Sequence, residues 1–359
     1  FYYTPPTGFL ALCTSNLPDV AVVPSEHFNT VLWTGNGTTG TNITNVGFAP
    51  SFTWLKGRDI GSDPHQLYDT VRGATKSLKS NATDAEITRS TGLTAFGTDG
   101  FTIGNHAYVN RNTSSYVAWN WKANGSGSSN TNGSITSTVS ANVDAGFSIV
   151  SYTGNSTDGA SIGHGLSKAP EIIIAKARSA DTSWYVYCDT IGTSKTLYLQ
   201  NTNAATTSGP PWTSVSSTTF AVNQNNDYDP AWINKSGNTY IAYCFHSVDG
   251  YSKFGSYTGN SNADGTFVYT GFKPAFVMIK NLSGWDWFMH DSAREPNNEN
   301  DVYLMANSSA AEGSTDYSHM DFVSNGFKLR SSSIVGNGSS YNIIYIAFAE
   351  TPFKYSNAK

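Results

Sequence analysis

The sequence predicts an all-β fold of three tandem, divergent antiparallel β-sandwich repeats, jelly-roll or concanavalin-like in type. The first observation behind this prediction is the composition. Aromatic residues make up 13% of the 359 residues and charged residues also only 13%, about half the usual charged share of roughly 25%. Aromatic and β-branched residues set among Ser, Thr, Asn and Gly are typical of sheets and turns. The second observation is a set of landmarks that recurs three times in the same order.

The first landmark is an aromatic-Thr-Gly-Asn sequence at residues 33–36, 152–155 and 257–260. We interpret its Gly and Asn as turn residues that accept a positive φ. The wide spacing of the three copies excludes solenoid repeats of about 20–50 residues and fits sandwich-sized domains.

The second landmark is a proline followed six residues later by a lysine, at Pro50 and Lys56, Pro170 and Lys176, and Pro274 and Lys280. Proline is tolerated at the first residue of a strand. The apolar residues between each pair do not alternate with polar ones, as expected for a strand buried on both faces. We expect the lysine to mark the exit of the strand to solvent. Each copy then ends in a β-rich run, at residues 116–119, 240–243 and 345–348.

Charge and cysteine content restrict the partners. The net charge of −5 is spread along the chain without basic blocks, which argues against nucleic acid as a partner. No apolar run approaches the length of about 20 residues that a membrane span needs, so we expect no membrane insertion. Cys188 and Cys244 lie in apolar, strand-like runs, and we expect both to be buried free thiols.

Motifs that carry catalysis are missing from the sequence. The Gly-Ser-Gly-Ser run at residues 125–128 lies in a low-complexity segment rather than in a strand–turn–helix elbow, and no phosphate loop or metal motif is present. We therefore predict no catalytic residues and no cofactor. Two pairs of carboxylates remain weak calcium candidates, Asp227 with Asp229 and Glu299 with Asp301. Paired carboxylates also suit glycoside hydrolysis, for which the candidates are Asp227 with Asp229, and Glu295, Glu299 and Asp301 in an Asn-rich loop. The simplest interpretation is a solvated loop.

An Asp-x-x-Arg spacing occurs in two of the three copies. It is found at Asp69 and Arg72 and at Asp291 and Arg294, whereas the matching places of the second copy hold Cys188 and Ile191. We interpret it as a structural ion pair that apolar packing replaces in the second copy. The alternative is a polar site kept in two copies.

Aromatic residues are the candidates for ligand binding, because sugar faces stack on exposed rings. Five aromatic residues lie near polar or turn residues: Trp184, Tyr185, Trp212, Trp285 and Trp287. Trp285 and Trp287 are favoured because alternating positions face the same side of a strand. For each ring the alternative is a place in the core.

Several longer segments carry a resemblance to a known family. Residues 147–154, 163–170, 240–245, 250–259 and 349–355 resemble a domain family of unknown function in virion-associated proteins of marine and cyanobacterial tailed phages. Residues 3–18 resemble the end of a SPRY-like sandwich domain, which often precedes these repeats. The resemblance implies that the chain is the C-terminal part of a longer polypeptide.

These observations predict a domain organisation. Residues 1–27 are expected to be the SPRY-like remnant and connector, 28–123 the first sandwich, 124–145 a polar linker, 146–248 the second sandwich, and 249–359 the third with its C-terminal tail. The linker resembles a flexible tether.

The resemblance implies a non-enzymatic protein of the virion surface, and hence an extracellular location, of tail fibre, adhesin or capsid decoration type. The expected partners are further copies of the chain, with a trimer favoured, other virion proteins and a host-surface glycan. The alternatives are a secreted carbohydrate-binding protein or the accessory part of a polysaccharide depolymerase, and, third, an active enzyme.

Overall fold

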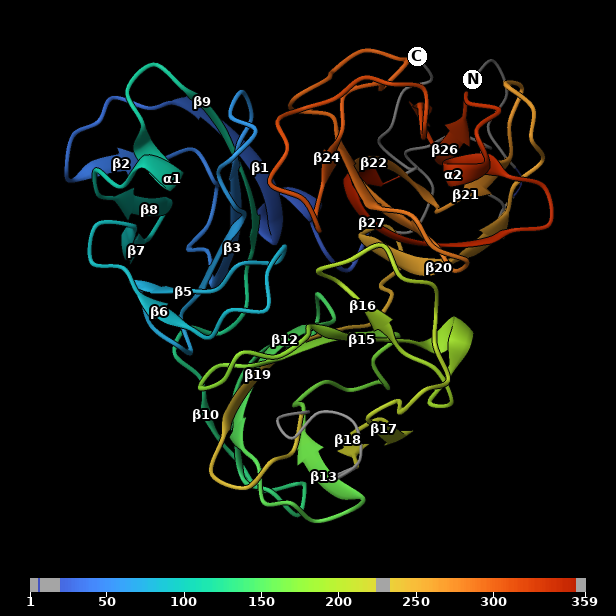
Figure 1. Cartoon of the computed structure of the whole chain (residues 1–359). Helices are drawn as coiled ribbons and strands as arrows, with labels where there is room; N and C mark the ends of the chain where they lie inside the picture. The colour runs from blue at the N-terminus through green and yellow to red at the C-terminus, as the bar shows by residue number, and fades with distance from the viewer. Residues whose placement is uncertain (1–5, 7–19, 224–232, 353–359) are drawn as a thin grey trace.

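The computed structural model describes residue 6, residues 20–223 and residues 233–352. Within these residues nearly all regular structure is β, arranged in seven sheets whose strand pairings are all antiparallel. This confirms the all-β prediction. Figure 1 shows three lobes, which we call unit 1 (residues 28–121), unit 2 (residues 128–245) and unit 3 (residues 252–352).

Unit 1 has a four-stranded sheet of order β1-β9-β3-β4, a three-stranded sheet of order β2-β8-β7, and the pair β5-β6. A short 3-10 helix, η2 (Pro24–Glu26), precedes the unit. Its elements are β1 (Phe28–Thr34), β2 (Thr41–Ile43), β3 (Phe52–Gly57), β4 (Gln66–Asp69), β5 (Lys76–Ser77), β6 (Ile87–Thr88), β7 (Leu93–Gly97), β8 (Gly100–Ile103), α1 (Ala107–Asn110) and β9 (Ser115–Trp121).

Unit 2 has a seven-stranded sheet of order β10-β11-β12-β19-β14-β15-β16 and a three-stranded sheet of order β13-β18-β17. Its elements are β10 (Ser128–Asn130), β11 (Ser137–Asn142), β12 (Phe147–Thr153), β13 (Ala160–Gly163), β14 (Ile172–Ala177), β15 (Tyr185–Cys188), η3 (Asp189–Ile191), β16 (Leu197–Tyr198), β17 (Trp212–Val215), β18 (Thr219–Val222) and β19 (Thr239–Phe245).

Unit 3 has a five-stranded sheet of order β20-β27-β22-β23-β24 and a three-stranded sheet of order β21-β26-β25. Its elements are β20 (Ser252–Thr258), β21 (Phe267–Tyr269), β22 (Phe272–Asn281), β23 (Trp287–Asp291), β24 (Leu304–Met305), β25 (Met320–Val323), β26 (Gly326–Leu329), α2 (Ile334–Asn337) and β27 (Asn342–Pro352).

One strand order is common to the larger sheets. It reads β1-β9-β3-β4 in unit 1, β12-β19-β14-β15 in unit 2 and β20-β27-β22-β23 in unit 3. The smaller sheets match in the same way, as β2-β8-β7, β13-β18-β17 and β21-β26-β25. Residues of the larger and the smaller sheet share a hydrophobic core within each unit. Corresponding residues of the three units can therefore be matched through these strand pairings.

The aromatic-Thr-Gly-Asn landmark ends the first of these strands, and close approach of backbone explains its glycine. A Cβ atom on Gly35, Gly154 or Gly259 would lie within 2.4 Å of a backbone atom of the segment opposite. None of the three glycines has a positive φ. The interpretation of these glycines as positive-φ turn residues is thus wrong, since it is space that requires them.

The prolines precede the central strands as expected, but the lysines do not reach solvent. Pro50 and Pro170 lie two residues before β3 and β14, whereas Pro274 lies inside β22 at an irregularity of the pairing with β27. The three lysines that follow are fully buried, and each ammonium donates to backbone carbonyl oxygens: Lys56 to Gly57 and Ile60, Lys176 to Ala180 and to Thr83 of unit 1, and Lys280 to Trp285. The expected exit to solvent is therefore wrong.

The β-rich run that closes each unit has the predicted alternation, but the predicted alignment of the third copy is shifted by two residues. Trp119 and Tyr243 pair with Trp54 and Ile174, and the equivalent pair in unit 3 is Ile346 with Met278. The match for residues 116–119 and 240–243 is thus residues 343–346, not 345–348. A shift of two residues leaves every side chain on its own face of the sheet, so the sequence pattern alone does not reveal it.

Residues 124–145 contain strands, so they are not a flexible linker. β11 pairs with β12 along its whole length, from Ser137 opposite Tyr152 to Asn142 opposite Phe147. The buried Ser137 hydroxyl donates to the Gly163 carbonyl over 2.9 Å. Residues with small hydroxyl side chains can form a strand as well as a flexible linker when a neighbouring strand is free to pair. The polar composition of this segment therefore did not reveal its strands.

A fourth hydrophobic core lies between the units and is shared by all three. It includes Trp121, Phe245 and Phe348 at matching positions of the larger sheets. Phe52 stacks on Tyr243 with ring centroids 4.2 Å apart, joining units 1 and 2. The free thiols of Cys188 and Cys244 are buried, as predicted. Each larger sheet is thus covered on both faces, by the core of its own unit and by the shared core.

Candidate functional site

The boundaries between the units repeat one set of contacts. At each boundary a ring N–H of one unit donates to a backbone carbonyl of its neighbour: Trp184 to Lys79 (2.8 Å), Trp287 to Tyr198 (2.9 Å) and His65 to Met305 (3.0 Å). His65 donates through Nε2 because its Nδ1 accepts the indole N–H of Trp54. The donors occupy equivalent places, four residues before Asp69, Cys188 and Asp291.

Each boundary also has a backbone hydrogen bond in addition to the bond from the aromatic or imidazole side chain. The three bonds, each 2.8 Å long, run from Glu86 N to Arg178 O, from Ala205 N to Leu282 O and from Glu312 N to Arg58 O. In the first set unit 2 donates to unit 1, unit 3 to unit 2 and unit 1 to unit 3. In the backbone set the donors run the opposite way, from unit 1 to unit 2, from unit 2 to unit 3 and from unit 3 to unit 1. Contacts of one direction that return to the start form a closed ring, as in a cyclic trimer, but within one chain.

The boundaries of unit 1 with units 2 and 3 each contain a buried ion pair. Arg72 Nε lies 2.5 Å from Asp69 Oδ2, and Arg294 Nε lies 2.5 Å from Asp291 Oδ2, with all four side chains fully buried. A side chain of the neighbouring unit donates a further hydrogen bond to each carboxylate. The Tyr243 hydroxyl donates to Asp69 over 2.8 Å, and the Trp119 indole N–H donates to Asp291 over 3.0 Å. Asp-x-x-Arg is therefore a structural ion pair, as we interpreted it.

A glutamate links each of these pairs to the next unit. Glu86 lies 3.2 Å from Arg72 and 3.0 Å from Arg178 of unit 2. Burial alone would raise the pKa of Glu86, but Arg178 and Arg72 together lower it. Glu312 likewise lies 3.2 Å from Arg294 and 2.7 Å from Arg58 of unit 1.

The boundary between units 2 and 3 has the same backbone contacts and, within the part of the chain that the structure describes, no equivalent ion pair. The residues that match the polar set are apolar: Cys188 and Ile191 for the Asp–Arg pair, Ala205 for the glutamate, Leu282 for the second arginine, and Ile346 for the aromatic donor. Cys188 and Ile346 lie in the shared core, and Ile191 and Leu282 pack against it. Burial raises the pKa of the Cys188 thiol, so this group stays neutral.

The aromatic residues predicted to bind a glycan do not form a platform. Trp184, Tyr185, Trp212 and Trp287 are each at most 3% exposed, so no sugar reaches their faces. Trp184 and Trp287 belong to the shared core and to the boundary contacts. Trp285 lies outside β23, with a φ of 66°, so it does not share a strand face with Trp287. The glycan assignment is wrong for Trp184 and Trp287, which lie in the shared core, and for Tyr185 and Trp212, which lie in the core of unit 2. Trp285 is partly exposed, and its assignment stays a prediction.

Of the carboxylate candidates, only those of the Asn-rich loop lie within the described residues. Asp227 and Asp229 lie outside the described residues. Glu299 is exposed and lies 3.7 Å from His319, and Asp301 lies in the same loop before β24. Among the described residues no group of three or more His, Cys, Asp or Glu side chains is placed to hold a metal ion.

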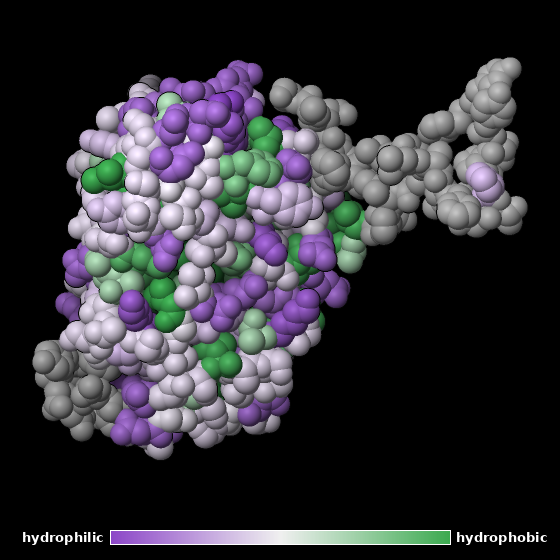
Figure 2. Space-filling model, turned by 90° about the vertical axis from the view of Figure 1, so that its right-hand side faces the viewer, coloured by the Kyte–Doolittle hydropathy of each residue, from purple (hydrophilic) through white to green (hydrophobic). Residues whose placement is uncertain are grey.

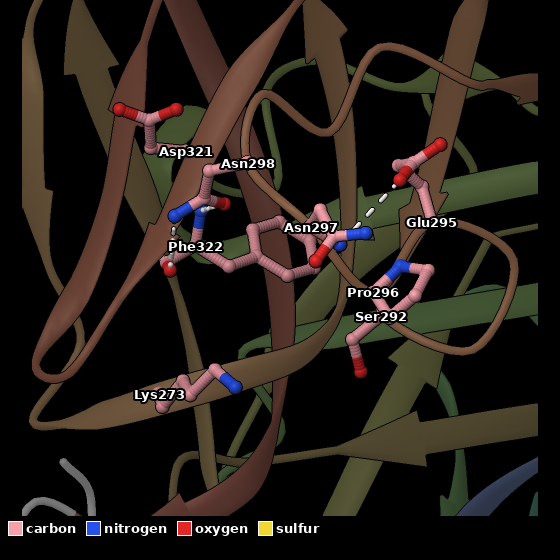
Figure 3. Close-up of a pocket in the computed structure, with 8 residues that line it drawn as sticks. All are labelled: Lys273, Ser292, Glu295, Pro296, Asn297, Asn298, Asp321 and Phe322. Carbon is pink, nitrogen blue, oxygen red and sulfur yellow. Dashed lines mark hydrogen bonds between the residues drawn. The ribbon is translucent and has the colours of Figure 1, made fainter. Parts of the chain in front are cut away.

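A polar pocket of about 340 Å³ in unit 3 was not predicted as such from the sequence, although its residue Glu295 was a carboxylate candidate. Its lining residues are Lys273, Ser292, Glu295, Pro296, Asn297, Asn298, Asp321 and Phe322. Figure 3 shows Lys273 on one side, Ser292, Pro296 and Glu295 on the other, and the Phe322 ring between them. The Asn298 side chain pairs with the backbone of Phe322, accepting its N–H over 2.9 Å and donating to its carbonyl over 3.0 Å. The one available signal was the Asn-rich loop at residues 295–300.

The outer surface is otherwise mixed. Figure 2 shows apolar side chains scattered among polar ones on the face in view. Among the described residues, no helix has the length and apolar character that a membrane crossing requires.

The fold and the contacts define an all-β protein of several antiparallel sheets, whose three units close into a ring around one shared core. The chain belongs to the family described as a domain of unknown function, DUF7483, which matches residues 23–352. The match therefore spans all three units as one domain. No curated protein and no solved structure matches the chain.

Proposed function

We propose that this chain is a non-enzymatic structural protein of the virion surface, built from three divergent copies of one β-sandwich unit. The observation that carries the proposal is the ring itself. The strand order and the two boundary contacts recur in all three units, and the buried polar groups at the boundaries bind one another. Because these polar groups hydrogen-bond to one another across the boundaries, they are not free to act on a substrate. This supports a rigid building block rather than a catalyst.

The location on a phage particle rests on the sequence resemblance, and low charge supports assembly with other copies. With 13% charged residues, electrostatic repulsion between copies is weak. The strands at the outer edges of the smaller sheets, such as β17 and β21, have unpaired backbone groups available for contacts. We propose a homo-oligomer, with a trimer favoured, in contact with other virion proteins.

The test has two arms. The chain should be located by reconstruction of a particle that contains it, with an interface above about 1,000 Å² to another copy or to a second virion protein. Incubation with a panel of polysaccharides should give no turnover. Reproducible cleavage that is lost on changing Asp227, Asp229 or Glu299 would overturn the non-enzymatic function. Absence from the particle would overturn the location.

The second candidate is a secreted carbohydrate-binding protein or the accessory part of a depolymerase. The polar pocket of unit 3 is the observation that favours it. The particle reconstruction separates it from the first candidate, because a secreted protein has no place there.

A further inference from the structure

The pocket of unit 3 is built by a loop that the ring does not require. Nine positions separate Asp69 from Leu78 and Cys188 from Leu197, whereas thirteen separate Asp291 from Leu304. These three leucines are matched by their places after the equivalent strands and lie in the shared core. The loop between β23 and β24 is thus four residues longer than its counterparts, and its residues 295–298 form the pocket wall. Loops added to a rigid scaffold are where binding residues concentrate.

The charges around the pocket leave one carboxylate without a basic partner. Lys273 is bound by Glu350 at 2.9 Å, and Asp321 is bound by Arg330 at 2.5 Å. Glu295 has no salt bridge among the described residues; its Oε1 accepts only the Asn297 backbone N–H, over 3.4 Å. The pocket therefore repels an anionic ligand and offers a strong acceptor to hydroxyl groups.

The remaining lining groups suit a polyhydroxylated ligand. The Asn297 side-chain amide and the Ser292 hydroxyl make no hydrogen bond to the described residues, so both are available as donors and acceptors. The exposed Pro296 adds apolar surface against which the C–H groups of a sugar ring can lie, whereas Phe322 is 3% exposed and belongs to the core of unit 3. A volume of about 340 Å³ is within the usual range for small-ligand sites, which starts at about 300 Å³.

A second hollow extends the pocket toward unit 1. It has a volume of about 150 Å³, shares Ser292 with the first, and is lined by Asn29 and Thr30 of β1 and by Glu350. Because Glu350 binds Lys273, one ion pair stands between the two hollows. A ligand longer than one sugar residue would therefore run from unit 3 toward unit 1.

We propose that this pocket binds a neutral oligosaccharide, with one sugar residue beside Asn297 and Pro296 and the next toward Asn29. The inference rests on the proposed function, to which it adds the place and the ligand class of glycan binding. A divalent cation does not fit the site, because only one carboxylate in it is free of a basic partner.

The test uses the whole chain and isothermal titration with neutral tetrasaccharides of glucose, galactose, mannose and N-acetylglucosamine, with tetragalacturonate as the acidic ligand. At least one neutral ligand should bind, and tetragalacturonate should not. Asn297→Ala should weaken that binding at least about ten-fold, because it removes paired donor and acceptor groups. Ser292→Trp, which fills the junction of the two hollows, should abolish it.

Glu299→Ala is the matched control, since Glu299 lies in the same loop but does not line the pocket; it should leave binding unchanged. Glu295→Gln should keep neutral binding and remove the discrimination against tetragalacturonate. The inference is overturned if no neutral ligand binds at millimolar concentration, or if Ser292→Trp binds as tightly as the parent. Particle location and the absence of turnover are measured independently of binding, so failure of the inference leaves the structural function standing.

Discussion

Two kinds of boundary join equivalent units of this molecule. The boundaries of unit 1 contain Asp–Arg pairs, a bridging glutamate and an aromatic donor, whereas the boundary between units 2 and 3 contains Cys188, Ala205, Leu282 and Ile346 in their places. The ring N–H to carbonyl bond and the backbone bond are present in both kinds. One backbone arrangement therefore accepts either a charged or an apolar set, provided that the whole set changes together.

The comparison distinguishes the contacts that stabilise the ring of units from the contacts that determine which units are neighbours. A buried ion pair is often no more stabilising than well-packed apolar residues of similar size, because both charges lose their hydration. A buried ion pair does, however, confer specificity. If a unit without the matching residues took the neighbouring place, a charge would stay buried without a partner. In a chain with three similar units, the polar boundaries disfavour exchange of one unit for another.

The largest effect is expected from breaking one polar boundary. Asp69→Ala leaves the fully buried Arg72 guanidinium without its carboxylate, and should lower the free energy of unfolding by about 3–5 kcal/mol. The equivalent change at the apolar boundary, Cys188→Ala, removes only a thiol and should cost about 1 kcal/mol. Urea unfolding followed by tryptophan fluorescence measures both.

The converse of this test converts the polar boundary into the apolar kind. Asp69→Cys, Arg72→Ile and Tyr243→Phe together leave no buried charge of the pair, and the triple variant should be more stable than Asp69→Ala alone. A triple variant as unstable as the single one would show that the ion pair contributes net stability, which contradicts the comparison.

A smaller effect is expected from the donor that crosses the boundary. Tyr243→Phe removes the hydroxyl that donates to Asp69 Oδ2 over 2.8 Å, and should lower the free energy of unfolding by about 1.5–3 kcal/mol, as for hydrogen bonds to charged groups. Tyr345→Phe is the control, because the Tyr345 hydroxyl makes no hydrogen bond to the described residues. Equal losses in the two variants would mean that the bond across the boundary has no special weight.

The sequence predicted the all-β class and the buried thiols, because composition and apolar runs reflect local requirements of strands. It did not predict the shared core. A strand buried on both faces has the same pattern whether a sheet, a helix or another unit covers the second face. For this reason the sequence left Trp184 and Trp287, which lie near turns, open between a place in the core and a ligand-binding surface.

The candidate site could not be predicted from the sequence for a different reason. The pocket depends on a loop longer by four residues, and this difference is visible only once Leu78, Leu197 and Leu304 are known to be equivalent. The Lys273–Glu350 pair joins residues 77 positions apart in the sequence, and no local spacing indicates that. The buried lysines show the same limit, since their carbonyl partners come from loop geometry.

The smallest effect concerns pH, and it distinguishes the boundary that closes the ring. That boundary uses His65 where the other two use tryptophan. Burial, with Lys56 nearby, lowers the pKa of His65 well below 6.5. The unfolded state therefore binds a proton that the folded state does not, so stability is complete above about pH 6.5 and is lost as the pH falls below it. Protonation would also place an N–H on Nδ1 against the indole N–H of Trp54.

Hydrogen exchange locates this effect within the ring. Between pH 7 and 5, protection should fall first at residues 78–81 and 304–306, which meet at the His65 boundary, and later at residues 197–199, which meet Trp287. His65→Gln can still donate to the Met305 carbonyl and does not titrate, so it should remove the early loss. His290 is also buried, with its pKa lowered to about 3 by burial and by Arg294, but it bonds only within unit 3. His290→Gln should therefore leave the early loss of protection in place, and a variant that abolished it would assign the acid sensitivity to the interior of unit 3 instead of to the closing boundary.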